Sequence, residues 1–231
     1  MNVIPKLFIA IDQNDINKAK DLIQKLSPEI CGIKIGKELF TVCGPEIIEW
    51  SQAKGFKIFL DLKYHDIPNT VEKACYAASE MGISILNVHA LGGKDMMLAA
   101  KEGVDKSNNN PYLIAVTLLT SMDARALKEI GLTSSVSDQV LNLAINTGQA
   151  GLDGIVCSAK DIPIIKNKLP ENFLYVTPGI RLNNSAKDDQ KRIATPFEAI
   201  EMGSNILVIG RPITQAINPE AVIKEIIKEI S

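Results

Sequence analysis

The sequence predicts an α/β fold, a single-domain (β/α)8 barrel of the TIM type that spans residues 1–231, and three observations support it. Eight short runs rich in Val, Ile and Leu recur along the chain, and a segment with helical periodicity follows each run. Most runs are continuously apolar, which is typical of parallel strands covered on both faces. No linker or shift in composition divides the chain. Eight alternating β and α segments in a chain of this length favour a compact barrel.

The expected strands share an apolar centre in which β-branched residues are frequent. They are Leu7–Asp12, Gly32–Gly36, Lys57–Lys63, Ile85–Ala90, Tyr112–Thr120, Gly154–Ala159, Phe173–Ile180 and Asn205–Arg211. A doubly wound open sheet is the alternative fold, but it usually has fewer strands. The dinucleotide-binding pattern G-x-G-x-x-G, which would support that fold, does not follow the first strand.

The expected helices carry apolar residues at intervals of three and four, as a helix that covers a sheet requires. They are Asn14–Leu26, Pro45–Lys54, Thr70–Met81, Lys94–Glu102, Ser137–Ala150, Asp161–Lys168, Thr195–Met202 and Pro219–Ile230. The first shows this spacing in Ile16, Ala19, Leu22 and Ile23. Several are followed directly by glycine, which is favoured just after a helix end, and Thr195-Pro196 is typical of a helix start.

Composition and charge argue against several functional classes. Hydrophobic residues make up 46% of the chain and the formal net charge is −2, so neither a nucleic-acid surface nor a membrane surface is expected. No run approaches the roughly 18 apolar residues that cross a membrane, and the first residues do not resemble a signal peptide. The cysteines form no C-x-x-C pair and are expected to be reduced, mostly buried thiols of a cytoplasmic protein: Cys31, Cys43, Cys75 and Cys157.

Polar and charged side chains gather at the expected carboxyl ends of the strands. In a (β/α)8 barrel the chemistry takes place at this end. A single charge there would be read as a solvated loop residue, but charges at several strand ends together predict an active site. The side chains are Asp12, Lys34, Asp61, Lys63, His89, Thr120, Ser121, Ser158, Arg181 and Arg211.

The densest group of charges lies in the segment Asp61–Thr70, at the end of an apolar run. Residues i and i+2 of a strand project to the same face, so Asp61 and Lys63 are expected to point together. Lys34, flanked by apolar residues on the preceding strand, is expected to pair with Asp61 because a buried ammonium needs a counter-charge. With Asp66 these residues would form an alternating array of cations and anions. A purely structural ion-pair network is the alternative.

A phosphate site is expected after the last two strands. Gly210 allows close approach of the backbone and Arg211 supplies a guanidinium, a combination suited to phosphate. Barrels often bind phosphate in the loops after the seventh and eighth strands, and Arg181 follows the seventh. The long polar segment 182–193 is expected to be a mobile lid, with an ordinary surface loop as the alternative.

These motifs together resemble the orotidine 5′-phosphate decarboxylase family over essentially the whole chain. The resemblance is carried by Ile58–Thr70 with its D-x-K-x-x-D pattern, Ile11-Asp12, Lys34, Leu118–Met122, Pro178–Arg181 with Gln190, and Ile209–Arg211. Other sugar-phosphate enzymes of the same superfamily share the D-x-K-x-x-D pattern. Lys34 and the Arg181/Gln190 pair favour the decarboxylase family over those other enzymes.

The resemblance implies a role for each matching residue. Lys63 would donate a proton to C6 of the pyrimidine, and Asp61 would lie next to the departing carboxylate. Lys34 and Asp66 would complete the charged array. Asp66, Ile67 and Thr70 would reach into the site of a neighbouring subunit, so a homodimer is expected. The family uses no metal and no organic cofactor. The implied substrate contacts are Asp12 and Lys34 to ribose hydroxyls, Thr120 and Ser121 to the pyrimidine, and Pro178, Arg181, Gln190, Gly210 and Arg211 at the phosphate.

Two other functions are compatible with these patterns. A Mg²⁺-dependent sugar-phosphate decarboxylase or synthase of the same superfamily would need an acidic residue on the second strand, where Lys34 stands. A non-catalytic protein that binds a phosphate ligand would use the phosphate site and leave the charged array without a function.

Overall fold

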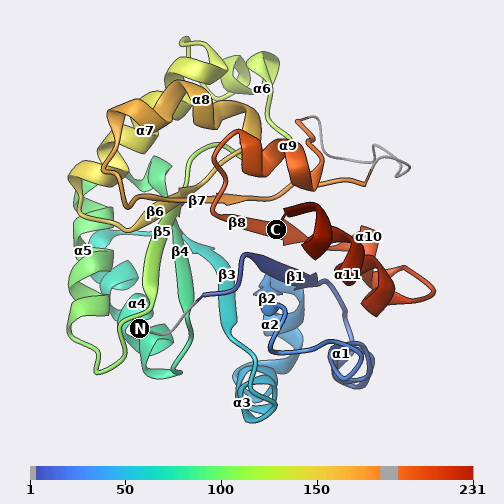
Figure 1. The fold of residues 1–231 in the computed structure, drawn as a ribbon. Coiled ribbons are helices and arrows are strands. Elements are labelled where there is room, and N and C mark those ends of the chain that lie inside the picture. Colours follow the sequence, from blue (N-terminus) through green and yellow to red (C-terminus); the bar gives the residue numbers. More distant parts are fainter. Residues whose placement is uncertain (1–3, 183–191, 231) are drawn as a thin grey trace.

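The computed structural model describes residues 4–182 and 192–230. Its strands run parallel and pair in chain order, and the last pairs with the first, so that they close a barrel (Figure 1). The strands are β1 (Leu7–Ile11), β2 (Gly32–Gly36), β3 (Ile58–Tyr64), β4 (Ile85–His89), β5 (Tyr112–Val116), β6 (Gly154–Val156), β7 (Leu174–Thr177) and β8 (Ile206–Ile209). The predicted (β/α)8 barrel is confirmed.

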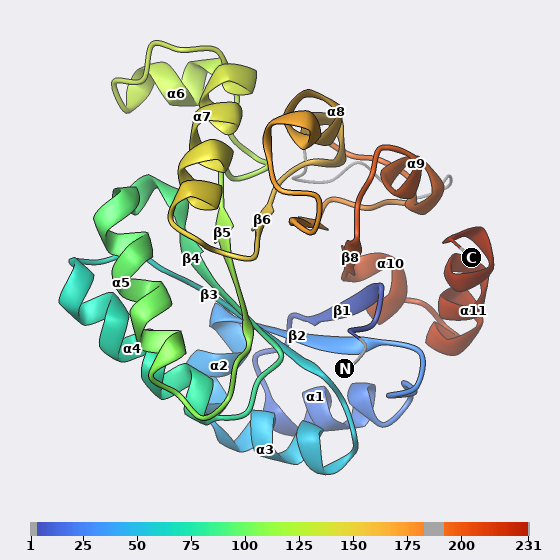
Figure 2. The same cartoon turned by 60° about the vertical axis from the view of Figure 1, so that its left-hand side comes forward.

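Helices alternate with the strands and surround the barrel (Figure 2). They are α1 (Ile16–Ile23), α2 (Lys37–Cys43), α3 (Glu46–Ala53), α4 (Pro68–Glu80), α5 (Gly93–Asp105), α6 (Ala124–Glu129), α7 (Val136–Gln149), α8 (Ile162–Ile165), α9 (Pro196–Glu201), α10 (Arg211–Thr214) and α11 (Pro219–Ile230). Short 3₁₀ turns cover Ala90–Gly92, Ala159–Asp161 and Lys166–Lys168. Each predicted helical segment contains a helix.

Three short helices, α2, α6 and α10, were not predicted. α2 follows directly on β2, and no side chain caps its start at Gly36. α6 begins after Asp123, whose carboxylate accepts hydrogen bonds from two backbone N–H groups of its first turn, a capping signal that is present in the sequence. α10 is a single turn that starts at Arg211, too short for a periodic pattern to reveal.

Two layers of apolar side chains stabilise the barrel. The larger lies between the strands and the helices. The smaller fills the barrel and consists of Phe8, Ala10, Phe59, Ile85, Ile114, Val176, Ile206 and Val208. Phe8 and Phe59 meet edge to face with ring centroids 6.1 Å apart. Gly32 is required beside them, because a Cβ at this position would lie 2.4 Å from the Phe8 ring.

Several strands are shorter than predicted. β5 ends at Val116 rather than Thr120, β6 at Val156 rather than Ala159, β7 at Thr177 rather than Ile180, and β8 at Ile209 rather than Arg211. The apolar runs continue past these ends because the loops begin with buried residues such as Leu118 and Ile180. Thr120, Ser121 and Arg181, which follow β5 and β7, therefore lie on loops, whereas Arg211 begins α10. Asp61 and Lys63 lie within β3.

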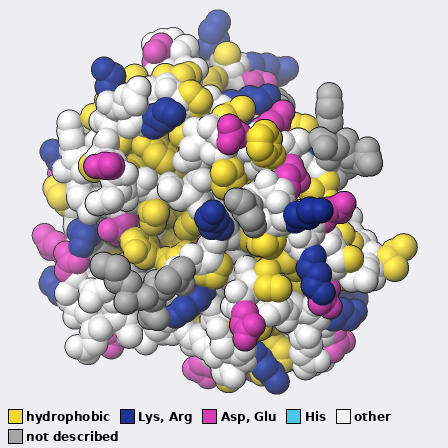
Figure 3. Space-filling view, in the orientation of Figure 1, with side chains coloured by type: hydrophobic (Ala, Val, Ile, Leu, Met, Phe, Trp, Pro, Cys, Tyr) yellow, Lys and Arg dark blue, Asp and Glu magenta, His cyan; other side chains and the backbone are white. Residues whose placement is uncertain are grey.

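The face of the molecule shown in Figure 3 carries Lys and Arg side chains interspersed with Asp and Glu. Neither sign dominates this face, in keeping with the net charge of −2. Within the described residues, no helix has both the length and the apolar character needed to cross a membrane.

Candidate active site

A cavity of about 300 Å³ lies at the carboxyl end of the barrel. Phe59 and Val208, from the layer inside the barrel, contribute to its apolar part. The predicted site residues that line it are Asp12, Lys34, Asp61, Lys63, Thr120, Ser121, Pro178, Arg181, Gly210 and Arg211. This volume and mixed lining are typical of a site for a small organic ligand.

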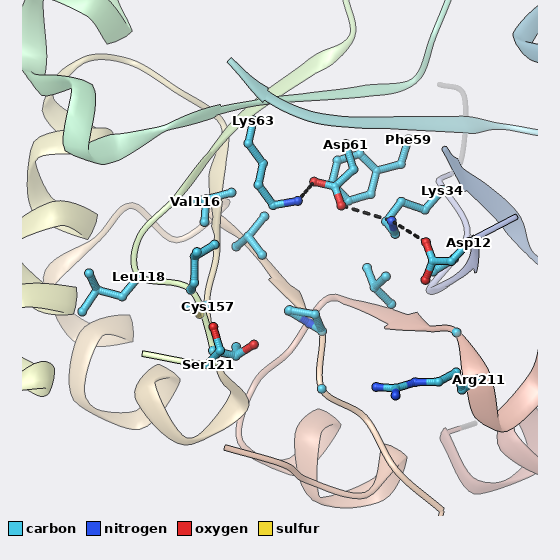
Figure 4. Close-up of a pocket in the computed structure, with 18 of the residues that line it drawn as sticks. Asp12, Lys34, Phe59, Asp61, Lys63, Val116, Leu118, Ser121, Cys157 and Arg211 are labelled. Carbon is cyan, nitrogen blue, oxygen red and sulfur yellow. Dashed lines mark hydrogen bonds and ion pairs between the residues drawn. The ribbon is translucent and has the colours of Figure 1, made fainter. Parts of the chain in front are cut away.

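Four charged side chains form a row of ion pairs along one wall of the cavity (Figure 4). Lys63 Nζ lies 2.6 Å from Asp61 Oδ1, and Asp61 Oδ2 lies 3.1 Å from Lys34 Nζ. Asp12 Oδ1 is 3.7 Å from the same Lys34 nitrogen. The predicted pairing of Lys34 with Asp61 is confirmed. Asp12 extends the row toward solvent, since its side chain is 60% exposed and that of Asp61 is 12% exposed.

The order of the strands brings these residues together. Lys34 of β2 pairs with Ala10 of β1, and Gly36 of β2 pairs with Asp61 of β3, so Lys34 stands between the two carboxylates. Gly36 leaves room for this arrangement, because a Cβ there would lie 3.1 Å from Lys34 Nζ. An alanine at this position would require the ammonium to shift by a few tenths of an ångström.

Asp61 is the buried anion at the centre of the row. Burial by itself raises the pKa of its carboxyl, but the ammonium groups of Lys34 and Lys63, with hydrogen bonds from Lys63 and Asn87, outweigh burial and lower the pKa from 3.8 to about 2. The carboxylate is therefore ionised at neutral pH and holds an ammonium on each side.

Asn87 of β4 belongs to this group, although it was not among the predicted site residues. Its side chain is fully buried, donates from Nδ2 to Asp61 Oδ1 at 2.6 Å and accepts at Oδ1 from the Lys63 N–H at 2.8 Å. The signal in the sequence is an amide within the apolar run Ile85–His89, because a buried amide needs partners for both of its polar atoms.

Arg211 lies across the cavity from these ion pairs (Figure 4). It is the first residue of α10 and follows Gly210 directly. Gly210 lies against the opposite wall, since a Cβ there would be in van der Waals contact with the Ala10 Cβ at 3.4 Å and with Asp12 Oδ2 at 3.6 Å. The cavity therefore has a charged wall on β2 and β3 and a guanidinium on its other side.

Arg181 also lines the cavity and is buried. Its Nη1 donates to the Ile180 carbonyl at 3.0 Å, whereas its buried Nε has no hydrogen-bond partner in the described part of the chain. A buried N–H group without a partner is costly, and an anion bound there would satisfy it. Gln190 and positions 183–191 of the predicted lid lie outside the described residues.

Asp66, Ile67 and Thr70 lie outside the cavity, before and within the first turn of α4. All three are exposed, and 67% of Ile67 is accessible to solvent. Asp66 Oδ1 accepts a hydrogen bond from the Ile67 N–H at 2.7 Å. Within one chain the ion-paired row thus ends in Asp12, and the contribution of Asp66 to the array stays a prediction that requires a second subunit.

Two residues predicted at strand ends do not line the cavity. His89 stacks on His65 with ring centroids 5.4 Å apart, and burial, together with the charges of His65, Lys63 and Lys37, lowers the pKa of His89 to about 4. Ser158 is buried beyond β6. Neither residue therefore forms part of the cavity wall.

The donor atoms in the cavity do not fit a divalent metal ion. The carboxylates that line it belong to Asp12 and Asp61, and the ammonium of Lys34 lies between them. Mg²⁺ requires carboxylate or other oxygen ligands without a competing cation. Elsewhere in residues 4–182 and 192–230, no three His, Cys, Asp or Glu side chains are grouped so that they could hold a metal ion.

Comparisons with known proteins point to one family. The family model described as Orotidine 5'-phosphate decarboxylase / HUMPS family matches residues 5–226. A relative from Pseudoalteromonas atlantica, named Orotidine 5'-phosphate decarboxylase, is 52% identical over 223 residues, which cover 96% of this chain and 96% of the relative. A relative of the same name from Legionella pneumophila (strain Corby) is 48% identical over 227 residues, with coverage of 98% and 99%.

Solved structures are similar over the whole barrel. Orotidine 5'-phosphate decarboxylase from Lactobacillus acidophilus has a TM-score of 0.88 and 38% identity, and the match covers 99% of this chain and 100% of that one. An uncharacterized conserved protein from Geobacillus kaustophilus has a TM-score of 0.86 and 34% identity, with coverage of 97% and 100%. Because the family model and these relatives match nearly the full length, this chain belongs to the orotidine 5′-phosphate decarboxylase / HUMPS family.

Proposed function

We propose that this protein decarboxylates orotidine 5′-phosphate to UMP, the last step of de novo pyrimidine nucleotide synthesis. The observation that carries the proposal is the cavity of about 300 Å³, in which the ion pair of Lys63 and Asp61 lies on one side and Arg211 on the other. A nucleotide with a carboxylate on its base and a phosphate at its other end matches this arrangement. Membership of the family supports the same activity.

Lys63 is the residue that acts on the reacting carbon. The bond between C6 and the carboxylate carbon breaks, CO2 leaves, and the electron pair remains on C6 in the plane of the ring, where conjugation cannot spread it. Stabilisation must then be electrostatic, and a cation held in place before the reaction supplies it. Lys63 Nζ offers this charge and then transfers a proton to C6. The neutral amine regains its proton from water.

Asp61 holds that cation in position. Its Oδ1 lies 2.6 Å from Lys63 Nζ, and with a pKa of about 2 it is ionised under working conditions. In the proposed complex it also lies beside the substrate carboxylate, and the repulsion between the two anions is relieved as CO2 departs. The orienting role has direct geometric support in the short hydrogen bond.

The other predicted residues bind the rest of the nucleotide. The Nε of Arg181, which has no hydrogen-bond partner among the described residues, supports an anion at the phosphate end of the cavity. Binding energy from that remote phosphate serves to place the base against Lys63. We assign Asp12 and Lys34 to the ribose hydroxyls, Thr120 and Ser121 to the pyrimidine, and Pro178, Arg181, Gln190, Gly210 and Arg211 to the phosphate.

The functional unit in this proposal is a homodimer. Asp66, Ile67 and Thr70 would enter the neighbouring subunit's site and bring Asp66 to the charged array. Their exposed position at the start of α4 leaves them accessible to a second subunit.

The metal-dependent alternative is less well supported. A Mg²⁺-dependent sugar-phosphate decarboxylase or synthase needs carboxylates that converge on the ion. Lys34 places an ammonium 3.1 Å from Asp61 and 3.7 Å from Asp12, where such an ion would have to bind.

One assay tests the proposal and separates it from the alternatives. The purified protein is mixed with orotidine 5′-phosphate, and the loss of pyrimidine absorbance is followed with and without EDTA. We expect rapid loss that EDTA does not change. Loss that EDTA abolishes would indicate the metal-dependent alternative. Binding of the nucleotide without any loss of absorbance would indicate a non-catalytic protein that binds a phosphate ligand.

A further inference from the structure

Strand β3 is irregular at the point where it carries the two reactive side chains. Leu60 and Tyr64 of β3 are four residues apart, yet they pair with residues of β4 that are only two apart. Residues 61–63 therefore face a single residue of β4, Asn87. A bulge of this kind changes the direction of side chains and is frequent beside active sites.

Lys63 has a strained backbone at this bulge. Its φ is +51°, and it is the only non-glycine residue with a positive φ in the described part of the chain. The left-handed region is unfavourable for a residue with a Cβ, so surrounding contacts must hold it there. The contact at this position is the hydrogen bond from the Lys63 N–H to Asn87 Oδ1, at 2.8 Å.

The same amide also holds Asp61. Asn87 Nδ2 donates to Asp61 Oδ1 at 2.6 Å, and this oxygen accepts from Lys63 Nζ at 2.6 Å. A backbone N–H only donates and a carboxylate only accepts, so the orientation of the Asn87 amide is determined by its partners. The residue is fully buried and does not line the cavity.

We infer that Asn87 is a positioning residue, which locks the β3 bulge so that Lys63 Nζ and Asp61 Oδ1 meet inside the cavity. The inference rests on the proposed catalytic role of Lys63 and extends it. Without the amide, the Lys63 backbone is free to leave the left-handed region, and its ammonium moves away from Asp61. A misplacement of about 1 Å in a catalytic group costs about 100-fold in rate.

The charged groups near position 87 come from two strands. Asp61 and Lys63 face it from β3, and Lys34 of β2 lies beyond Asp61. On its other side β4 pairs with β5, which presents the apolar run Leu113–Val116. His89 follows on β4 itself and stacks on His65.

Asn87→Asp tests the inference through its pH dependence. The protonated carboxyl still donates to Asp61 and accepts from the Lys63 N–H, whereas the ionised carboxylate repels Asp61 and has no proton to donate. Two adjacent carboxyl groups share a proton and retain it to a higher pH than one alone. We therefore expect kcat of Asn87→Asp, relative to wild type, to rise as the pH falls from about 8 to about 5.

Asn87→Leu removes both hydrogen bonds at similar volume. We expect kcat to fall about 100-fold and KM to stay within about threefold of the wild-type value. The ratio of the variant's kcat to that of the wild type should be the same across this pH range. Asn205→Leu is the control, at an exposed amide that also accepts from a backbone N–H. Asn205 Oδ1 accepts from the Tyr175 N–H at 2.8 Å, at the amino end of β8 and away from the cavity, so its loss should leave kcat unchanged.

A crystal structure of Asn87→Leu gives a measurement that does not depend on activity. We expect the Lys63 φ to leave the left-handed region and the distance from Lys63 Nζ to Asp61 Oδ1 to exceed 2.6 Å. Unchanged geometry, or wild-type kcat in this variant, would overturn the positioning role. If the variant does not fold, a pH-independent activity ratio in Asn87→Asp would overturn it instead. If the wild type does not decarboxylate orotidine 5′-phosphate, the proposed function is refuted. Altered Lys63 geometry in Asn87→Leu would in that case still show that Asn87 holds the Lys63 backbone in place.

Discussion

The paired carboxylate of Asp61 contributes a pH-dependent part of the stability. Burial raises the pKa of this group, but its ion pairs with Lys34 and Lys63 lower it from 3.8 to about 2. One pKa unit corresponds to about 1.4 kcal/mol, so a difference of slightly less than two units gives about 2 kcal/mol. Because the pKa is depressed in the folded state, this contribution is complete above about pH 4 and is lost as the pH falls through about 2.

Asp61→Asn removes the titrating group with little change in volume. We expect the free energy of unfolding of the wild type, minus that of the variant, to be constant between about pH 7 and pH 5 and to decrease by about 1 kcal/mol at pH 3. Urea unfolding followed by circular dichroism at each pH measures it. The subtraction cancels the titration of the other carboxyl groups, which both proteins share.

A difference that stays constant down to pH 3 would refute this account of Asp61. Glu46→Gln is the control. Its carboxylate is 64% exposed and lies 2.7 Å from Lys20 Nζ at the surface. Exposed ion pairs contribute little because water screens them, so this variant should differ from the wild type by only a small amount.

Three further predictions concern activity. Lys63→Ala should lower kcat by about 10²–10³-fold, or about 2.7–4 kcal/mol, while UMP still binds; an unchanged kcat would contradict its role. Arg211→Ala should lower kcat/KM for the nucleotide by about 10- to 100-fold. The same variant should leave the slow turnover of orotidine, which lacks the phosphate, unchanged; equal losses for both substrates would contradict the assigned phosphate contact. Mixing inactive Asp66→Ala with inactive Lys63→Ala should restore about a quarter of wild-type activity, because half of the dimers are mixed and each has one intact site. Mixtures that stay inactive after subunit exchange would argue against the shared site.

The amino-acid sequence by itself determined the barrel and the end at which the site lies. Continuous apolar runs between amphipathic helical segments specify parallel strands covered on both faces, and parallel strands bring all of their carboxyl ends to one side. The charges that follow these runs therefore had to gather there. The pairing of Lys34 with Asp61 was also predictable, because a lysine within an apolar strand needs a counter-charge close by.

Only the tertiary structure decided the details that depend on register. Asn87 is 24 and 26 residues away from Lys63 and Asp61 along the chain, and no local pattern links them. The bulge in β3 and the positive φ of Lys63 arise from the alignment of β3 with β4. Periodicity reports which side chains are buried, whereas contacts between strands depend on how distant segments align. For that reason the sequence predicted the charged residues of the site but not the amide that holds them.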